Sequence, residues 1–229
     1  MIKASLLLSF MVLANATDAQ QISTIQISFT YGSKVLSMDD SLNQSNDSSV
    51  LRITQLKFYI SKIKFLNHGK VVMEENNSFH LVDASQINSL QILIDNKQNI
   101  PFDELKFNLG LDSTTNVSGA LGGDLDPTKG MYWTWQSGYI NFKLEGKSNV
   151  CKTRNNEFAF HLGGYQQPYY GLQTLSFPLN NTDRIHLNLD VLEIIKEIDL
   201  TKTNHIMSPS AEAVMLSKIV ANAFTLSKN

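Results

Sequence analysis

LRITQLKFYISKIKFLNHGKVVM, residues 51–73, alternates apolar and polar side chains over most of its length. Alternation with period two is typical of a β-strand that buries one face. The parity of the apolar residues changes between Ile53 and Leu56, and it changes again after Ile60. Two such changes predict β-bulges in one strand, or two strands that turn a corner. The tripeptide HGK at 68–70 predicts a hairpin turn before the next strand.

The same alternation recurs in short runs along the rest of the chain. These runs cover residues 23–32, 89–95, 104–110, 139–146, 157–164, 172–179 and 184–190. Gly, Asn, Asp and Pro lie at the joints, where turns need them. Many short alternating strands predict a mainly β fold, an antiparallel sandwich or barrel, and we expect a sandwich of the Ig-like or Greek-key type.

Two segments carry helical patterns instead. In residues 190–198, Asp190 can cap a short helix. In residues 208–224, Ser208 is a candidate cap, Pro209 suits the first helical position and Glu212 lies in the first turn. The apolar stripe of this second segment predicts a C-terminal helix that packs on the sandwich or closes one end of it.

The N-terminus has the layout of a secretory signal peptide. Lys3 precedes an apolar stretch at 4–14, and small residues then allow cleavage after Ala16 or Ala19. The apolar stretch is shorter than the roughly 20 residues that a membrane span needs, although a short anchor helix is an alternative. We therefore expect a signal peptide at 1–19 and one exported domain at 20–229, with its core at about 22–226, in the periplasm or secreted.

The composition limits the classes of partner that we expect for this chain. The net charge is −2 and 17% of the residues are charged, with no basic run, so we expect no nucleic-acid partner. No later apolar run is long enough to span a membrane. Cys151 is the only cysteine, which excludes an internal disulfide. It is a small buried hydrophobe, a soft metal ligand or a cross-link site.

Residues 110–138 form a long Gly-rich connection that ends in both tryptophans of the chain. Asp112, Asp124 and Asp126 raise the question of calcium, but their spacing does not match an EF-hand and turn chemistry explains them more simply. In an extended strand Trp133 and Trp135 would lie side by side on one face. They either fill the core beside Phe142 and Phe160 or are kept for chemistry.

The five histidines form none of the short zinc-hydrolase motifs, and the nucleophile-elbow, P-loop and dinucleotide motifs are also missing. We therefore expect a binding protein and not an enzyme. Imidazoles that converge from separate strands can still bind copper or zinc. Met207 and Cys151 are soft donors that would suit Cu(I) if they joined such a site.

Several motifs resemble those of one family. They are similar to motifs of the MbnP-like family. These are exported bacterial proteins related to the copper-binding protein that is encoded beside methanobactin genes. The matching stretches are LGLDSTTNVSGALGGDLDPTKGMYWTWQSGYINFKLEG at 109–146, FAFHLGGY at 158–165 and NHIMSP at 204–209. The resemblance covers roughly residues 22–226 and implies a β-sandwich, a periplasmic or secreted location and copper handling.

The resemblance also implies site residues and a partner. A MauG-like di-haem protein of the cytochrome c peroxidase type would oxidise Trp133 or Trp135 to kynurenine, with Tyr132 and Tyr139 as supporting aromatics. Three histidines match motifs of the family and are therefore the implied copper ligands. In order of preference they are His161, His205 and His80, and Met207 and Cys151 are possible further donors.

Two other functions stay open. The chain could be a protein substrate or interaction module of the di-haem enzyme, with no metal of its own. It could also be a structural surface sandwich, which predicts that His80, His161 and His205 lie far apart. Direct ligation instead requires His161, His205 and a tryptophan within about 6 Å of each other.

Overall fold

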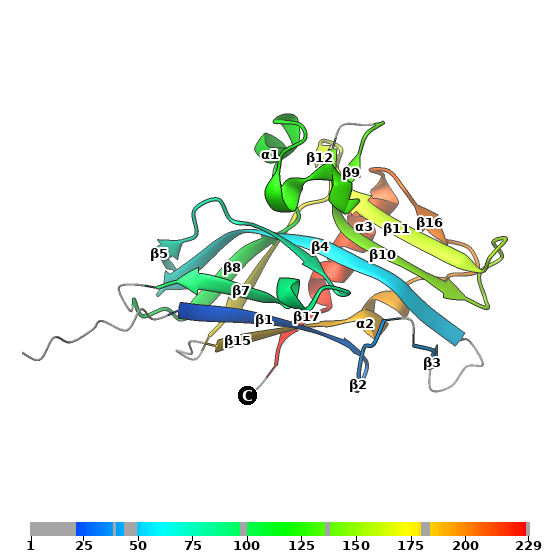
Figure 1. Ribbon diagram of the computed structural model, residues 1–229, viewed down its shortest axis with the longest axis horizontal. Coiled ribbons are helices and arrows are strands. Elements are labelled where there is room, and N and C mark those ends of the chain that lie inside the picture. The colour runs from blue at the N-terminus through cyan, green and yellow to red at the C-terminus, as the bar shows by residue number, and fades with distance from the viewer. Residues whose placement is uncertain are drawn as a thin grey trace, which may run out of the picture.

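The computed structural model describes residues 22–38, 40–43, 50–96, 100–135, 138–179 and 184–227. The fold class is confirmed: the protein is mainly β, with two sheets facing each other and a helix near the C-terminus (Figure 1). The signal peptide predicted at 1–19 lies outside the described residues.

The smaller sheet contains five strands among the described residues. They are β2 (Lys34–Val35), β1 (Ile22–Tyr31), β15 (Arg184–Asp190), β17 (Phe224–Leu226) and β7 (Gln91–Asp95). β1 pairs with β15 in parallel and with β2 and β7 antiparallel. The sequence predicted antiparallel strands, so the parallel pairing of β1 with β15 differs from that prediction. The reason is that alternation indicates a strand but not the direction of its partner.

The larger sheet is built around β4. In its main path β14 (Gln173–Pro178), β8 (Glu104–Leu109), β4 (Val50–Asn67), β10 (Gly138–Ser148), β11 (Glu157–Gly163) and β16 (His205–Ile206) lie in that order. Short strands also pair with β4 or β10: β3 (Leu42–Asn43), β5 (Lys70–Glu74), β6 (Phe79–Asp83) and β9 (Tyr132–Trp133). A separate hairpin joins β12 (Tyr165–Gln166) to β13 (Tyr169–Tyr170).

The changes of parity in 51–67 are bulges in one long strand. The register of β4 shifts against β10 beside Gln55, and it shifts against β8 between Ser61 and Lys64. Between these last two, Lys62 adopts a left-handed φ of 54°. The predicted hairpin turn follows, with φ values of 50° at His68 and 75° at Gly69. Such turns need positive φ at both central residues, which glycine adopts without steric cost.

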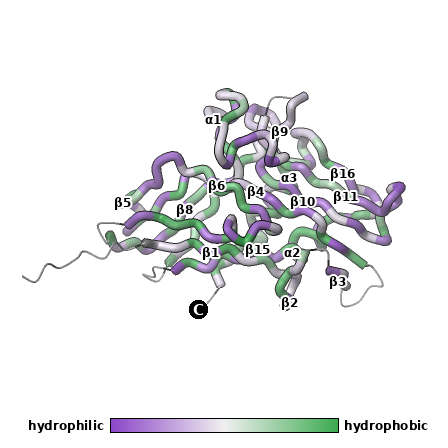
Figure 2. The backbone as a smooth tube through the Cα atoms, in the orientation of Figure 1, coloured by the Kyte–Doolittle hydropathy of each residue, from purple (hydrophilic) through white to green (hydrophobic). Residues whose placement is uncertain are grey.

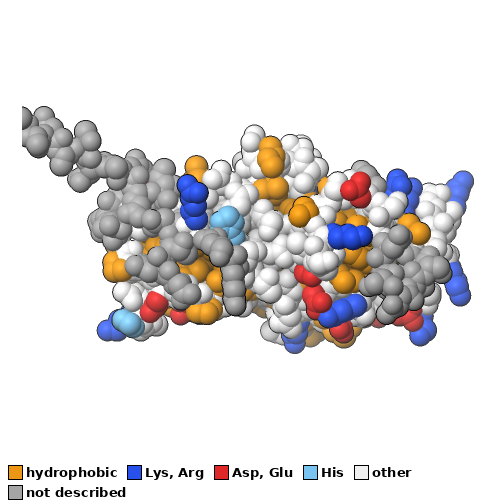
Figure 3. Space-filling model, turned by 90° about the horizontal axis from the view of Figure 1, so that it is seen from below, with side chains coloured by type: hydrophobic (Ala, Val, Ile, Leu, Met, Phe, Trp, Pro, Cys, Tyr) orange, Lys and Arg blue, Asp and Glu red, His pale blue; other side chains and the backbone are white. Residues whose placement is uncertain are grey.

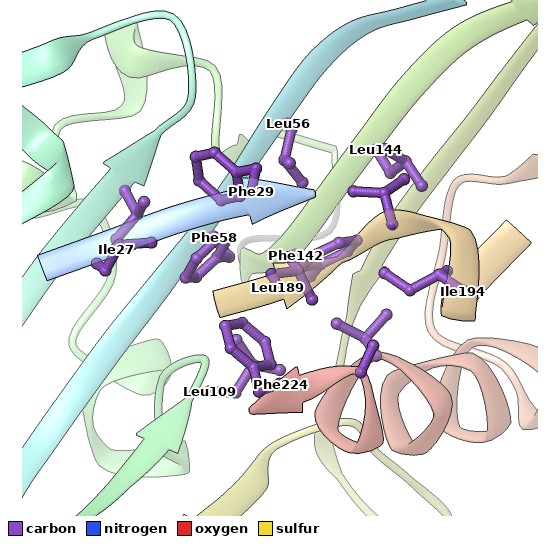
Figure 4. Close-up of a cluster of buried hydrophobic side chains, with 14 of the residues drawn as sticks. Ile27, Phe29, Leu56, Phe58, Leu109, Phe142, Leu144, Leu189, Ile194 and Phe224 are labelled. Carbon is purple, nitrogen blue, oxygen red and sulfur yellow. The ribbon is translucent and has the colours of Figure 1, made fainter. Parts of the chain in front are cut away.

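The main core fills the space between the sheets (Figure 4). Phe58 of β4 is fully buried there, and its ring centroid lies 6.2 Å from that of Phe29 in the smaller sheet and 5.4 Å from that of Phe224. Hydrophobic and hydrophilic residues alternate along the long strands (Figure 2). Each sheet therefore turns an apolar face towards this core, as the alternation predicts.

Three α-helices and three single 3₁₀ turns occur in the described parts of the chain. They are α1 (Ser113–Val117), α2 (Val191–Ile195), α3 (Ala211–Asn222), η1 (Ile87–Leu90), η2 (Gly123–Leu125) and η3 (Pro127–Lys129). As predicted, Asp190 caps α2 and α3 packs on the sandwich, where it contacts β11, β14 and β17. The predicted cap of α3 is wrong, because Ser210 and not Ser208 accepts a hydrogen bond from the Ala213 amide, at 3.1 Å.

The connection 111–135 covers part of the outer face of the larger sheet, and its α1 and β9 form the projection at the top of Figure 1. It buries a second, smaller cluster of side chains: Tyr59, Leu81, Leu111, Leu125, Met131, Trp133, Tyr139 and Ile140. On the opposite side of the molecule, charged side chains of both signs lie interspersed where Figure 3 shows them in colour. Within the described residues, no helix is long and apolar enough to cross a membrane.

Candidate metal and modification site

His161 lies on β11, on the face of the larger sheet that points away from the main core. Its strand neighbours Phe160 and Leu162 belong to that core, so alternation places the imidazole on the outer face. The residue is only 7% exposed and lies opposite Lys143 of β10. A buried histidine on an otherwise polar face is a candidate binding residue.

Glu145 is the hydrogen-bonding partner of His161. Its Oε1 lies 2.6 Å from His161 Nε2, diagonally across the β10–β11 pair. The hydrogen bond from His161 lowers the pKa of Glu145, against the opposing effect of burial and with help from the positive charges of Lys143 and Lys57. The carboxylate is therefore held in its charged form beside the imidazole.

Lys143 connects this strand pair to the tryptophan segment. Its Nζ donates a hydrogen bond to the Gly130 carbonyl at 2.5 Å, and burial lowers the pKa of the amine although Glu145 opposes this. Gly130 has a left-handed φ of 76° and ends η3 just before β9. Lys143 thus anchors the backbone from which Trp133 and Trp135 project.

Trp133 lies against β11 two residues beyond His161. It is 5% exposed, and a Cβ added to Gly163 would lie 2.7 Å from Cζ3 and 2.8 Å from Cη2 of its ring. Gly163 shares the outer face with His161, since they are two residues apart in one strand. The indole Nε1 is buried and finds no hydrogen-bond partner among the described residues. The structure therefore brings Trp133 and His161 to neighbouring positions.

Trp135 does not share a strand face with Trp133, so that expectation is wrong. β9 contains only Tyr132 and Trp133, and the chain turns at Thr134 and Trp135. Trp135 is 66% exposed, yet its ring centroid lies 6.2 Å from that of Trp133. The two rings are therefore neighbours across the turn, with their planes tilted by 53°.

The interpretation of the tryptophans as a core pair beside Phe142 and Phe160 is also wrong. Those two phenylalanines belong to the main core between the sheets, whereas Trp133 belongs to the small cluster on the outer face. The glycine-rich connection supplies the residues that cover it. The sheet therefore separates the indole from the main core.

The supporting tyrosines lie next to each other in this small cluster. The ring centroids of Tyr132 and Tyr139 are 4.9 Å apart, and that of Tyr59 lies 6.0 Å from Tyr139. The Tyr139 hydroxyl accepts from the Leu121 amide at 2.9 Å and is 3.0 Å from the Leu125 carbonyl, to which it can donate. Burial raises the pKa of Tyr139, so the hydroxyl stays protonated and fastens the connection to the sheet.

His205 lies on the edge strand β16, beside β11, and Met207 follows this strand. His205 pairs with Ala159 in parallel, and buried Ile206 pairs with Phe160. The pairing ends at Ile206, and Met207 is the residue that directly follows β16. His205 is exposed and Met207 is 44% exposed, so both side chains lie at the surface.

His80 and Cys151 are not brought to His161. His80 lies on β6, three strand spacings from β11 through β4 and β10, which is about 14 Å. It contacts Glu75 at 2.8 Å and lines a polar pocket of about 410 Å³ with Lys57 and Asp83. Cys151 is 2% exposed within the main core, where burial raises the pKa of its thiol.

Two of the three aspartates of the long connection, Asp112 and Asp126, act as helix caps. Asp112 accepts from the Thr115 amide at 2.8 Å and Asp126 from the Thr128 amide at 2.8 Å. Asp124 binds Lys129 at 2.6 Å and the Leu81 amide at 3.0 Å. The turn interpretation is confirmed for Asp112 and Asp126, whereas the Asp124 carboxylate joins the connection to β6. Within the described part of the chain, no three His, Cys, Asp or Glu side chains form a group that could hold a metal ion.

Sequence reasoning missed Glu145, Lys143 and Gly163. A signal was present, because the alternation of 139–146 puts Lys143 and Glu145 on the polar parity, opposite to Phe142 and Leu144. The pairing of β10 with β11 in this register could not be read from one strand alone. It decides which polar side chain meets His161.

Comparison with known proteins agrees with the family resemblance. The MbnP family model matches residues 20–208. MbnP from Methylosinus trichosporium has the same fold, with a TM-score of 0.64 at 14% identity over 86% of this chain and 87% of that chain. No curated protein matches this chain in sequence. Because the family model covers most of the chain, the protein belongs to the MbnP family.

Proposed function

We propose that this chain is an exported copper-binding protein in which His161 is a ligand and Trp133 is the residue converted to kynurenine. One observation supports this most directly: the Trp133 ring lies over Gly163, two residues from His161 on the same face of β11. Residues two apart in a strand are about 6.6 Å apart, within reach of two side chains that share one ion.

The donors on β11 and on the neighbouring segment 205–207 suit copper. His161 and His205 offer imidazole nitrogens and Met207 a thioether, which are ligands that copper accepts and that Cu(I) favours. An intact indole is a hydrogen-bond donor only. Kynurenine would instead present an aryl amine and a ketone, both able to coordinate a metal. The proposal does not include His80, which lies about three strand spacings from β11, or Cys151, which is buried in the main core.

The proposal includes export by the segment 1–19 and oxidation by a MauG-like di-haem partner. Cleavage of the indole C2–C3 bond adds two oxygen atoms, and loss of the formyl carbon as formate leaves kynurenine. The net gain is about 4 Da, as simple formula arithmetic gives. Two molecules of hydrogen peroxide, activated at the di-haem partner and reduced to water, supply the two oxygen atoms and the four oxidising equivalents, and water hydrolyses the N-formyl group to release the formate.

Protein made in its own host, with the partner present, tests the proposal. Peptide mapping should find a gain of about 4 Da at Trp133 and not at Trp135. Copper analysis after loading with Cu(I) should find one bound equivalent. The His161→Ala variant should lose this copper. His186→Ala, a control in the smaller sheet, should retain it. A copper content below about a tenth of an equivalent in the native protein would contradict the copper proposal.

A second candidate function is that of a protein substrate for the di-haem enzyme, with copper incidental. The exposure of Trp135 and its ring contact with buried Trp133 favour it, since an exposed aromatic can pass electrons from an inner one to a docked partner. It predicts a modified mass together with no bound copper. Trp135→Phe should then slow the modification of Trp133.

A further inference from the structure

The contact between Glu145 and His161 limits which ring nitrogen can bind a metal. Glu145 Oε1 lies 2.6 Å from Nε2, and the two side chains are 26% and 9% exposed, so water competes little for the contact. An ionised carboxylate only accepts hydrogen bonds. The nitrogen that faces it must therefore carry the hydrogen.

We infer that Glu145 is a positioning residue that holds His161 as the Nε2–H tautomer and leaves Nδ1 as the metal-binding atom. Metal-bound histidines commonly donate their other ring N–H to a carboxylate, which orients the ring and makes the free nitrogen more basic. The inference rests on the proposed copper function. It adds the ligating atom and the residue that selects it.

The neighbouring charges leave this role to Glu145. Lys143, opposite His161, is held by the Gly130 carbonyl, and an ammonium cannot accept a hydrogen bond from a ring N–H. Nδ1 has no hydrogen-bond partner among the residues described. The negative carboxylate also favours a cation nearby, whereas Lys143 alone would repel one.

Nitrogen-15 NMR of the metal-free protein tests the tautomer without any copper. When the imidazole of His161 is in its neutral form, it should carry its single hydrogen on Nε2. Glu145→Ala should give a mixture of both tautomers. Glu157→Ala removes a carboxylate of the same strand pair that binds Lys147 and should change nothing at His161. Hydrogen on Nδ1 in the native protein would overturn the inference, even if no variant folds.

Copper affinity provides the second readout. Glu145→Ala should weaken Cu(I) binding by about 10- to 100-fold, and Glu157→Ala should leave it unchanged. An unchanged affinity in Glu145→Ala, with copper lost in His161→Ala, contradicts the role of Glu145 while the proposed function stands. If His161→Ala keeps its copper, the proposed ligand is wrong, and the NMR result still decides the tautomer.

Discussion

Gly163 makes room for the indole of Trp133, because any Cβ at this position would overlap its ring. The added atom would lie 2.7 Å from Cζ3 of Trp133 and 2.7 Å from the Tyr139 carbonyl. The carbonyl belongs to β10 and cannot move without disturbing the sheet. Displacement of the ring therefore relieves only one of the two close contacts, and the other strains the β10–β11 pair.

Gly163→Ala should displace Trp133 and destabilise the protein by about 1–3 kcal/mol, the usual cost of overpacking. In a Trp135→Phe background, the fluorescence emission should shift to the red as the buried indole meets water. Gly122→Ala is the control, since nothing lies within 4 Å of a Cβ there. An unshifted emission would show that Trp133 does not depend on Gly163.

Asp83 is a residue whose contribution to stability depends on pH. It binds Lys57 at 2.9 Å and the Ser85 hydroxyl at 2.7 Å. Burial alone would raise its pKa, but the hydrogen bonds from Lys57 and Ser85 outweigh burial and lower it. A lowered pKa in the folded state means that stability is present above the unfolded pKa of about 3.9 and is lost as pH falls through the folded value.

Asp83→Asn should therefore cost about 1–2 kcal/mol of unfolding free energy at pH 7, and this deficit should shrink below about pH 4. Urea unfolding at pH 7, 5 and 3 measures it. Glu74→Gln, which removes an ion pair to Lys64 that is nearly half exposed, should cost under about 1 kcal/mol. A deficit of equal size at every pH would contradict the explanation.

Among the elements, α3 shows how packing selects a helix start. The sequence Ser208-Pro209-Ser210 offers two serines as caps. Docking buries Ala213, Leu216 and Val220 against the sandwich, and the helix then starts at Ala211. Ser210 precedes it with extended backbone, which is the conformation of a cap.

Ser210→Ala should destabilise the protein by about 1 kcal/mol, because the Ala213 amide loses its acceptor. Ser208→Ala is the matched control and should stay within about 0.5 kcal/mol of the parent. The midpoint of chemical denaturation distinguishes the two variants. Equal losses would mean that the cap contributes nothing.

At the scale of the whole molecule, stability depends on the contact between the two sheets. Phe58 of the larger sheet touches Phe29 and Phe224 of the smaller one and stacks on Phe142 of its own sheet, 6.0 Å away (Figure 4). A fully buried ring in such a place contributes transfer free energy and fills a volume that its neighbours cannot close.

Phe58→Ala should lower the unfolding free energy by about 3–5 kcal/mol. Leu93→Ala, in the smaller sheet but 58% exposed, should cost far less. Thermal and urea unfolding of both variants provide the comparison. A small loss in Phe58→Ala would show that the sheets are held together elsewhere.

Much of the fold was predictable because alternation reports burial directly. The run 51–73 predicted a bulged strand and a turn at 68–70, and both are present. The prediction of one strand that carries both tryptophans is wrong, because β9 has only two paired residues before the chain turns. The turn falls at Thr134 and Trp135, residue types that favour a strand, so the local pattern predicts the wrong structure there.

Local pattern was therefore enough for most of the strands, for their buried faces and for the family resemblance. Tertiary structure alone decided that His205 lies on the strand next to that of His161 while His80 and Cys151 lie elsewhere, and that Glu145 is the partner of His161. The physical reason is that a strand's alternation specifies which side chains share a face, whereas register between distant strands specifies which of them meet.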